Sequence, residues 1–134
     1  MRVSGSTRPH RERFLILKEK DGTRYLPIWI GTFEADQIVF FLYQVPQARP
    51  LAHDFTVAAI SHLGGKCLNA AITEVEGDTY HANVVIEQGD RQVEVDARPS
   101  DAVNVVLRAG APIFVHESLL REWPTDDEPE AESA

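Results

Sequence analysis

The residues best suited to chemistry in this sequence are polar, and they stand in three short segments. These segments are "GTFEA" at 31–35, "RPLAHD" at 49–54 and "DARPSD" at 96–101. Phosphodiester hydrolysis needs carboxylates that hold a divalent metal, a group that transfers a proton, and cations that contact the phosphate. The candidates of these types are Glu34, Arg49, His53, Asp54, Asp96, Arg98, Ser100 and Asp101.

The same residue types also suit a purely structural role. A carboxylate in the first turn of a helix complements the helix dipole, and this is the simplest interpretation of Glu34 and Asp101. Arginine–carboxylate pairs can also tie helix ends to a sheet or to a second subunit, and His53 can cap or pack. Residue types and spacing alone leave both interpretations open.

The common signatures of other enzyme classes are absent from the sequence. It contains no GxGxxG, GxxxxGK[ST], GxSxG, HExxH or paired CxxC motif, so dinucleotide-binding, Walker-type, hydrolase and zinc-site classes lack their signals. No lysine lies two residues after an acid, so the D/E-x-K element of many metal-dependent nucleases is missing too. No motif in the sequence supports an enzyme that acts on a small molecule.

Length and composition predict one folded domain. The chain has 134 residues, of which 43% are hydrophobic and 25% are charged, and both values are near globular averages. Cys67 is the single cysteine, so no internal disulfide can form, and we expect it to fill the core. No segment is long and apolar enough to span a bilayer, and the N-terminus has no apolar signal region, which predicts a cytoplasmic protein.

The chain divides into three parts. We interpret 1–12 as a divergent N-terminal segment, 13–122 as the folded domain and 123–134 as an acidic, disordered tail. The net charge is −8, and the tail accounts for five of these charges. The remainder has no basic stripe of the kind that nucleic-acid-binding proteins usually carry. Charge therefore neither requires nor excludes a substrate that bears phosphate.

Periodicity predicts the elements of the first half. Two apolar runs over 13–30, separated by Asp21 and Gly22, predict a β-hairpin. A helix is expected from Thr32 onward, and a second one over about 50–63. Four apolar residues recur in the second helix and predict its buried face: Leu51, Phe55, Ala59 and Leu63. His53 and Asp54 fall off this face and are expected to be accessible.

The second half alternates with a period of two over 66–97, which predicts a three-stranded antiparallel meander with Asp96 on its polar face. Pro99 suits the first position of a third helix, since it has no N–H to lose, and Gly110 and Pro112 are expected to end that helix. Asp101, Asn104 and Arg108 fall on one stripe of this otherwise apolar helix, which indicates a wet or paired seam.

One further strand is expected after the third helix. The order of elements is then strand, strand, helix, helix, three strands, helix and strand. This order predicts a single α+β domain in which a mixed, mostly antiparallel sheet packs with about three helices.

Three segments together resemble the bifunctional nuclease domain family, also called DUF151. They are "LPIWIGTFEADQI" at 26–38, "RPLAHDF" at 49–55 and "DARPSDAVNVVLRAGAPIFV" at 96–115. The resemblance extends from about 13 to 120 and keeps the order and spacing of the family's motifs. It implies an α+β fold, self-association to a dimer or higher oligomer, and cleavage of both DNA and RNA, as described for some members. This chain has Ala52 and Asn104 where the family usually has threonine and a small or aliphatic residue.

The resemblance implies a metal-dependent nuclease as the first hypothesis. Glu34, Asp54, Asp96 and Asp101 would bind Mg²⁺ or Mn²⁺, His53 would transfer a proton, and Arg49, Arg98 and Ser100 would contact the nucleic acid. The alternative is a non-enzymatic, oligomeric binding or regulatory module in which the ions are structural. Carboxylates already saturated by arginine and backbone donors would favour the module.

Overall fold

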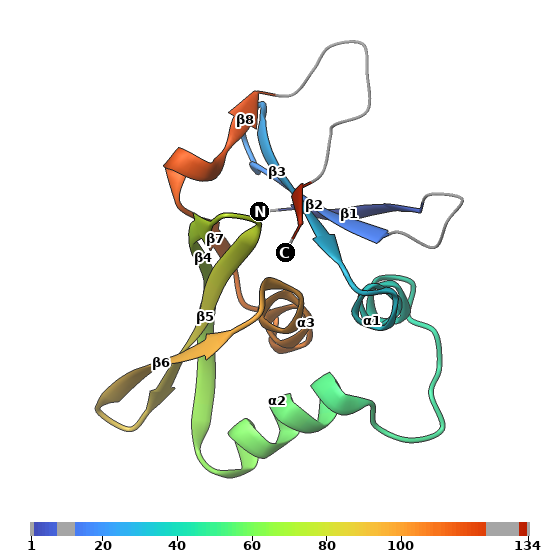
Figure 1. Ribbon diagram of the computed structural model, residues 1–134. Helices are drawn as coiled ribbons and strands as arrows, with labels where there is room; N and C mark the ends of the chain where they lie inside the picture. Colours follow the sequence, from blue (N-terminus) through green and yellow to red (C-terminus); the bar gives the residue numbers. More distant parts are fainter. Residues whose placement is uncertain (1, 8–12, 123–131, 134) are drawn as a thin grey trace.

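The computed structural model describes residues 2–7, 13–122 and 132–133, which form three helices and two β-sheets (Figure 1). The element order confirms the predicted α+β class. A single sheet was expected, whereas the strands divide between two sheets. Strand pairing over long sequence distances decides this division, and local periodicity does not report it. The predicted tail falls almost wholly outside the described residues.

The first sheet contains β1 (Arg2–Thr7), β2 (Arg13–Lys18), β3 (Arg24–Ile30), β8 (Arg121–Glu122) and β9 (Glu132–Ser133). The path β1-β2-β3-β8 is antiparallel throughout, and β9 pairs with β3 in parallel. The strands β2 and β3 confirm the predicted hairpin. β3 leads directly into the first helix and thereby fixes the position of that helix.

The second sheet contains β4 (Gly65–Glu76), β5 (Thr79–Gln88), β6 (Arg91–Ala97) and β7 (Ile113–Val115) in the order β6-β5-β4-β7. The first three strands form the predicted antiparallel meander, and β7 joins β4 in parallel. Antiparallel neighbours can be joined by short turns, whereas the parallel strand needs a longer connection. The third helix lies within that connection, between β6 and β7.

The helices are α1 (Thr32–Leu42), α2 (Ala52–His62) and α3 (Pro99–Ala109). Figure 1 shows α3 at the centre of the domain, where it packs against α1, α2, β4 and β5. Pro99 is its first residue and Gly110 ends it in the left-handed conformation, as the sequence predicted. In the described ranges, no helix combines the length and apolar character that crossing a bilayer requires.

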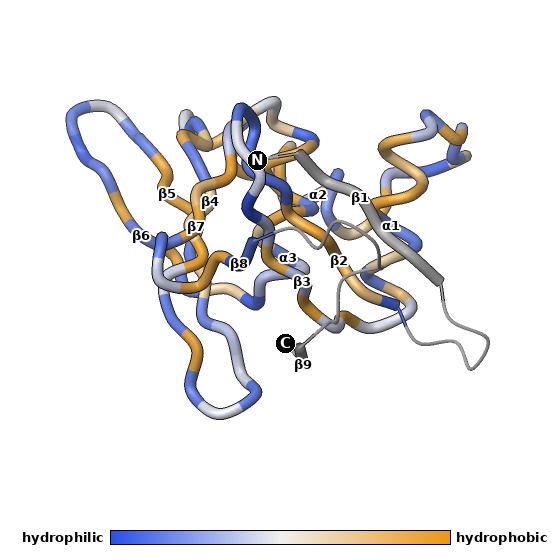
Figure 2. The backbone as a smooth tube through the Cα atoms, turned by 90° about the horizontal axis from the view of Figure 1, so that it is seen from above, coloured by the Kyte–Doolittle hydropathy of each residue, from blue (hydrophilic) through white to orange (hydrophobic). Residues whose placement is uncertain are grey.

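The main core lies between α3 and the inner faces of the two sheets. Its side chains come from alternate positions of the strands, with Leu15, Leu17, Leu26 and Ile28 from the first sheet. The tube in Figure 2 is hydrophobic along β2 and hydrophilic at the tip of the β5–β6 hairpin. Cys67 is buried in this core, which confirms its predicted role.

The predicted buried face of α2 is wrong. Phe55 is 66% exposed and Leu63 is 75% exposed, whereas His53 is buried. The helix instead directs Val57 and Ile60 toward the core. Positions 53, 57 and 60 follow the helical repeat as well as the predicted set does, so only the packing of α2 on α3 and β4 selects between the two faces.

Candidate functional site

Four side chains are linked through the guanidinium group of Arg98 and the carboxylate of Asp101, and they form what we call the Arg98 cluster: Glu34, His53, Arg98 and Asp101. Arg98 donates from Nε to Asp101 Oδ2 at 2.9 Å and from Nη2 to Asp101 Oδ1 at 3.3 Å. Its Nη2 also donates to Glu34 Oε1 at 3.0 Å. His53 Nε2 lies 3.0 Å from Asp101 Oδ1. Each of the three sequence segments therefore contributes to this cluster.

The helix N-termini bring the Arg98 cluster together. Glu34 is the third residue of α1, His53 the second of α2 and Asp101 the third of α3, while Arg98 is the N-cap of α3. A helix N-terminus carries unpaired N–H groups and a partial positive charge. Three such ends meet around the cluster, which accommodates its two carboxylates and would also favour a bound anion.

The Asp101 carboxylate and the Arg98 guanidinium shift each other's pKa. Burial raises the pKa of Asp101, but hydrogen bonds from Arg98 and His53, together with their charges, outweigh this and hold the pKa below its ordinary value. Hydrogen bonds to Asp101 and then to Glu34 raise the pKa of Arg98 further above its ordinary value. The Arg98–Asp101 ion pair is therefore charged at neutral pH.

One edge of the Arg98 guanidinium is left for a ligand. Nη1 forms no hydrogen bond with any residue that the structure describes, and the side chain is 65% exposed. Glu34 also keeps a free oxygen in this sense, because only Oε1 accepts from Arg98. Its carboxylate lies over Gly31, so a side chain at position 31 would displace Oε2. The cluster thus offers one donor edge and one acceptor oxygen.

Asp54 belongs to a second, separate network. Its Oδ1 accepts from Arg108 Nε at 2.7 Å, and its Oδ2 accepts from the backbone N–H of Leu51 at 2.8 Å. Burial raises the pKa of Asp54, but these donors and the positive charges of Arg108 and His53 outweigh the effect, so its pKa is lowered. Both oxygens of Asp54 are therefore engaged by protein donors.

Arg108 joins all three helices. Besides Asp54 of α2, it donates to the carbonyl of Gln37 in α1 at 3.0 Å and to the carbonyl and Oδ1 of Asn104 at 3.1 and 3.0 Å. Asn104, which is fully buried, donates from Nδ2 to the carbonyls of Glu34 and Ser100. The polar stripe of α3 is thus hydrogen-bonded to α1 and α2, which confirms that its side chains are paired.

The carboxylates predicted to bind a metal do not form one site as placed. Among the residues with described side chains, no three or more histidine, cysteine, aspartate or glutamate residues gather in a group able to hold an ion. Arg98 lies between Glu34 and Asp101 and forms an ion pair with each, and Asp54 forms an ion pair with Arg108. The donor types suit Mg²⁺ or Mn²⁺, but their arrangement does not fit a resident metal.

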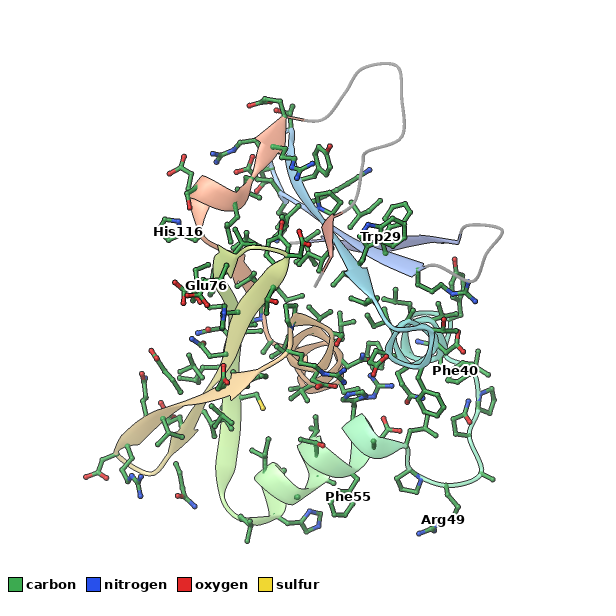
Figure 3. The ribbon with its side chains drawn as sticks, in the orientation of Figure 1. Trp29, Phe40, Arg49, Phe55, Glu76 and His116 are labelled. Carbon is green, nitrogen blue, oxygen red and sulfur yellow. The ribbon has the colours of Figure 1, made fainter. Side chains whose placement is uncertain are left out.

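Two of the predicted site residues lie apart from the cluster. Asp96 is exposed and pairs with Asn83 in the second sheet, while its neighbours Val95 and Ala97 pair with the buried Val84 and Ala82. Asp96 therefore faces away from the helices, as its alternation predicted. Arg49 lies on the connection between α1 and α2 and points away from the body of the domain (Figure 3).

His53 was expected to be accessible, and the structure corrects this expectation. Its side chain is 11% exposed, with Nε2 on Asp101 and Nδ1 buried without a hydrogen-bond partner among the described residues. It packs at the start of α2 behind the Asp101 carboxylate. From this position His53 orients Asp101, and it does not itself reach a ligand.

A cleft of about 390 Å³ opens beside the cluster. Its walls come from the end of β3, the start of β5 and the start of α3, and the lining includes Gly31, Thr79, Arg98 and Ser100. Ser100 is only 5% exposed, and its hydroxyl forms no hydrogen bond with a described residue. The cleft is thus the space that the free edge of Arg98 and the motif serine share.

The lowered pKa values predict how stability depends on pH. A group whose pKa is lower in the folded protein binds protons more weakly there than in the unfolded chain. Its stabilising contribution is complete above the unfolded value of about 4 and is lost as pH falls through the folded value. We expect the free energy of unfolding to decrease as the pH falls below about 4, and to decrease less in Asp101→Asn than in the wild type. Urea unfolding at each pH measures both. Equal slopes of the free energy of unfolding against pH for the wild type and Asp101→Asn would contradict this prediction.

Three residues in or beside the site were not among the candidates that the sequence indicated, namely Thr79, Asn104 and Arg108. Asn104 and Arg108 had been noted as a polar stripe with Asp101, and that stripe was the available signal. Their partners include backbone carbonyls of α1, about which side-chain patterns give no information. Thr79 is the first residue of β5 and has no motif around it, and nothing in the sequence singled it out.

This fold and cluster define a class of α+β domain in which motif arginines and carboxylates meet at helix N-termini. The model of the bifunctional nuclease domain matches residues 15–128. That range covers most of the chain and includes all three motif segments. The chain belongs to the bifunctional nuclease domain family.

Several curated proteins are similar to the chain. An uncharacterized protein of Mycobacterium tuberculosis is 38% identical over 130 residues, which cover 94% of this chain and 77% of that protein. Bifunctional nuclease 2 of Arabidopsis thaliana is 28% identical over 109 residues, and bifunctional nuclease 1 of the same plant is 27% identical over 109. The chain spans about a third of these two plant proteins, 33% and 34% respectively.

Proposed function

We propose that this domain hydrolyses phosphodiester bonds in DNA and RNA at the Arg98 cluster. The observation that carries the proposal is the meeting of all three motif segments around a guanidinium whose free edge borders a cleft. Family membership and the names of the plant relatives add support. The reaction class follows from what an arginine and a carboxylate can do together.

Arg98 and Glu34 take the direct roles in this proposal. Arg98 Nη1 would donate to a phosphate oxygen and stabilise the charge that develops there. Glu34 Oε2 would accept a proton from the attacking water, as a general base, while the water oxygen bonds to phosphorus and the bond from phosphorus to one sugar oxygen breaks. The leaving sugar oxygen would take a proton from solvent. Asp101 is a positioning residue because it holds Arg98 through two hydrogen bonds, and His53 in turn holds Asp101.

Dependence on Mg²⁺ or Mn²⁺ remains part of the proposal. The two carboxylates and the one guanidinium of the Arg98 cluster together carry a net charge of −1. A polyanionic substrate is repelled by this charge and by the net charge of −8 on the chain. A divalent cation supplied with the substrate would offset both, which is why the assay needs separate metal and chelator arms.

The test is cleavage of end-labelled single-stranded DNA and RNA by the purified protein in Mg²⁺, Mn²⁺ or EDTA. We expect the wild type to cleave both polymers and Arg98→Met to be slower by about 100-fold, which is the usual effect of removing one charge-stabilising donor. Arg91→Met, at the exposed start of β6, is the matched control and should keep the wild-type rate. Equal rates for Arg98→Met and wild type would reject the assigned role of Arg98.

A second candidate is an oligomeric binding or regulatory module without activity. It is favoured by the saturation of Asp54 and Asp101, whose four oxygens all accept hydrogen bonds from protein donors. Self-association, which this candidate requires, is supported by exposed aromatic residues on and beside α1 and α2, namely Phe33, Tyr43 and Phe55. No cleavage in any arm, with an oligomer in sedimentation, would favour the module, whereas a monomer without cleavage would contradict both candidates.

A further inference from the structure

We infer that the cleft beside the Arg98 cluster binds a phosphate group of the nucleic-acid substrate, with Ser100 and Thr79 as hydroxyl donors. The inference rests on the proposed function, because it identifies where the substrate backbone is held. Thr79 was not among the residues that the motifs indicated. It enters only because β5 begins at the opposite wall of the cleft.

The first turn of α3 supplies the main observation. Its N-cap is Arg98, which makes no side-chain capping hydrogen bond, and Pro99 has no N–H. The N–H groups of Ser100 and Asp101 therefore have no partner inside the helix. Backbone donors and the positive end of a helix dipole are the usual features of phosphate sites at helix N-termini.

The Ser100 hydroxyl is the independent observation that indicates a ligand. Ser100 is only 5% exposed, yet its hydroxyl has no hydrogen-bond partner among the described residues. The hydroxyl oxygen of Ser100 is not fully buried, so it keeps contact with solvent. Since Ser100 lines the cleft, that contact is with the space where a phosphate would lie.

The opposite wall completes a set of donors. Thr79 is exposed at the start of β5 and lines the cleft, and its hydroxyl forms no hydrogen bond with a described residue. Together with Arg98 Nη1, the site offers one charged donor edge, two hydroxyls and the first N–H groups of α3. All are donors, and phosphate oxygens are acceptors.

Directed hydrogen bonds must supply most of the affinity here. The carboxylates of Glu34 and Asp101 already offset the charge of Arg98, so net charge does not attract a phosphate to the cleft. Loss of a single hydroxyl is therefore expected to be visible in binding. An exposed basic patch would behave differently, because its affinity is distributed over many charges.

The experiment measures binding separately from cleavage. In a Trp123→Phe background, Trp29 is the sole tryptophan, and it lines the cleft. Its fluorescence is titrated with inorganic phosphate and with a short single-stranded phosphorothioate oligonucleotide that resists hydrolysis. We expect both probes to change the fluorescence, and Ser100→Ala and Thr79→Val each to weaken binding by about 10-fold, which corresponds to one hydrogen bond to a charged group.

Ser61→Ala, on the exposed surface of α2, is the matched control and should bind as the wild type does. Binding that depends on Ser100 and Thr79 without any cleavage would uphold the inference while the proposed function fails. Cleavage together with unchanged binding by both variants would overturn the inference and leave the proposed function intact. Absence of any fluorescence change with either probe would also overturn it. Thr79→Val preserves the side-chain shape at an exposed position, so this arm remains informative even if Ser100→Ala fails to fold.

Discussion

Replacing Glu34 by glutamine is expected to lower the cleavage rate by about 100-fold or more, the lower end of what a general base contributes. Glutamine preserves the size of the side chain, and its carbonyl oxygen can still accept the hydrogen bond from Arg98 at the position of Oε1. It cannot take a proton from water. The change therefore removes the proposed chemistry and keeps the packing of α1 over Gly31.

The control for this variant is Asp36→Asn in the same helix. Asp36 lies 4.0 Å from Arg13 and has no contact with the Arg98 cluster. Both variants should unfold in urea near the wild-type concentration, whereas only Glu34→Gln should lose kcat while keeping KM. Glu34→Gln as active as the wild type would show that another group accepts the proton, and a rise in KM alone would assign Glu34 to binding.

Replacing Arg108 by methionine is expected to lower the free energy of unfolding by about 3 kcal/mol. The guanidinium is 6% exposed and donates to Asp54, to the carbonyls of Gln37 and Asn104, and to Asn104 Oδ1. Methionine fills much of the same space but donates nothing. The side-chain oxygen of Asn104 then loses its partner in the interior. Asp54 is 39% exposed and can turn to water, which keeps the loss near the lower end for a buried pair.

Urea unfolding measures this loss, and Arg13→Met serves as the control. Arg13 is also a partly buried arginine at an element end, but its nearest carboxylate is 4.0 Å away, so its replacement should cost well under 1 kcal/mol. If Arg108→Met lowers the free energy of unfolding no more than Arg13→Met does, the hydrogen bonds of Arg108 do not stabilise the packing of the three helices. An altered urea slope would indicate a change in the denatured state.

The predictable part of the fold is the part that local chemistry dictates. Turn residues and alternation located the β2–β3 hairpin and the β4–β6 meander, and Pro99 and Gly110 marked the ends of α3. The orientation of α2 was not predictable in this way. Two sets of apolar positions satisfy the helical repeat, and contacts with α3 and β4 decide that Val57 is covered and Phe55 is not.

The site shows the same limit. The sequence identified the segments that meet, but it grouped Asp54 and Asp96 with Glu34 and Asp101. In the fold, Asp54 faces Arg108 and Asp96 faces the opposite side of its sheet. Which carboxylate meets which arginine depends on how helices from distant parts of the chain are placed. Residue types constrain the chemistry of a cluster, and only the tertiary arrangement assigns its partners.

The dipeptide formed by Arg98 and Pro99 has a further consequence. The residue before a proline is restricted to the extended region in any state of the chain, and Arg98 occupies that region in the fold, with φ −68° and ψ 148°. The unfolded chain therefore already samples the backbone conformation that presents the guanidinium. Less conformational entropy is lost when the arginine is ordered. The backbone of Arg98 is thus restricted in the unfolded chain as well as in the fold. A ligand that contacts Nη1 therefore meets a side chain that is carried by a rigid backbone segment.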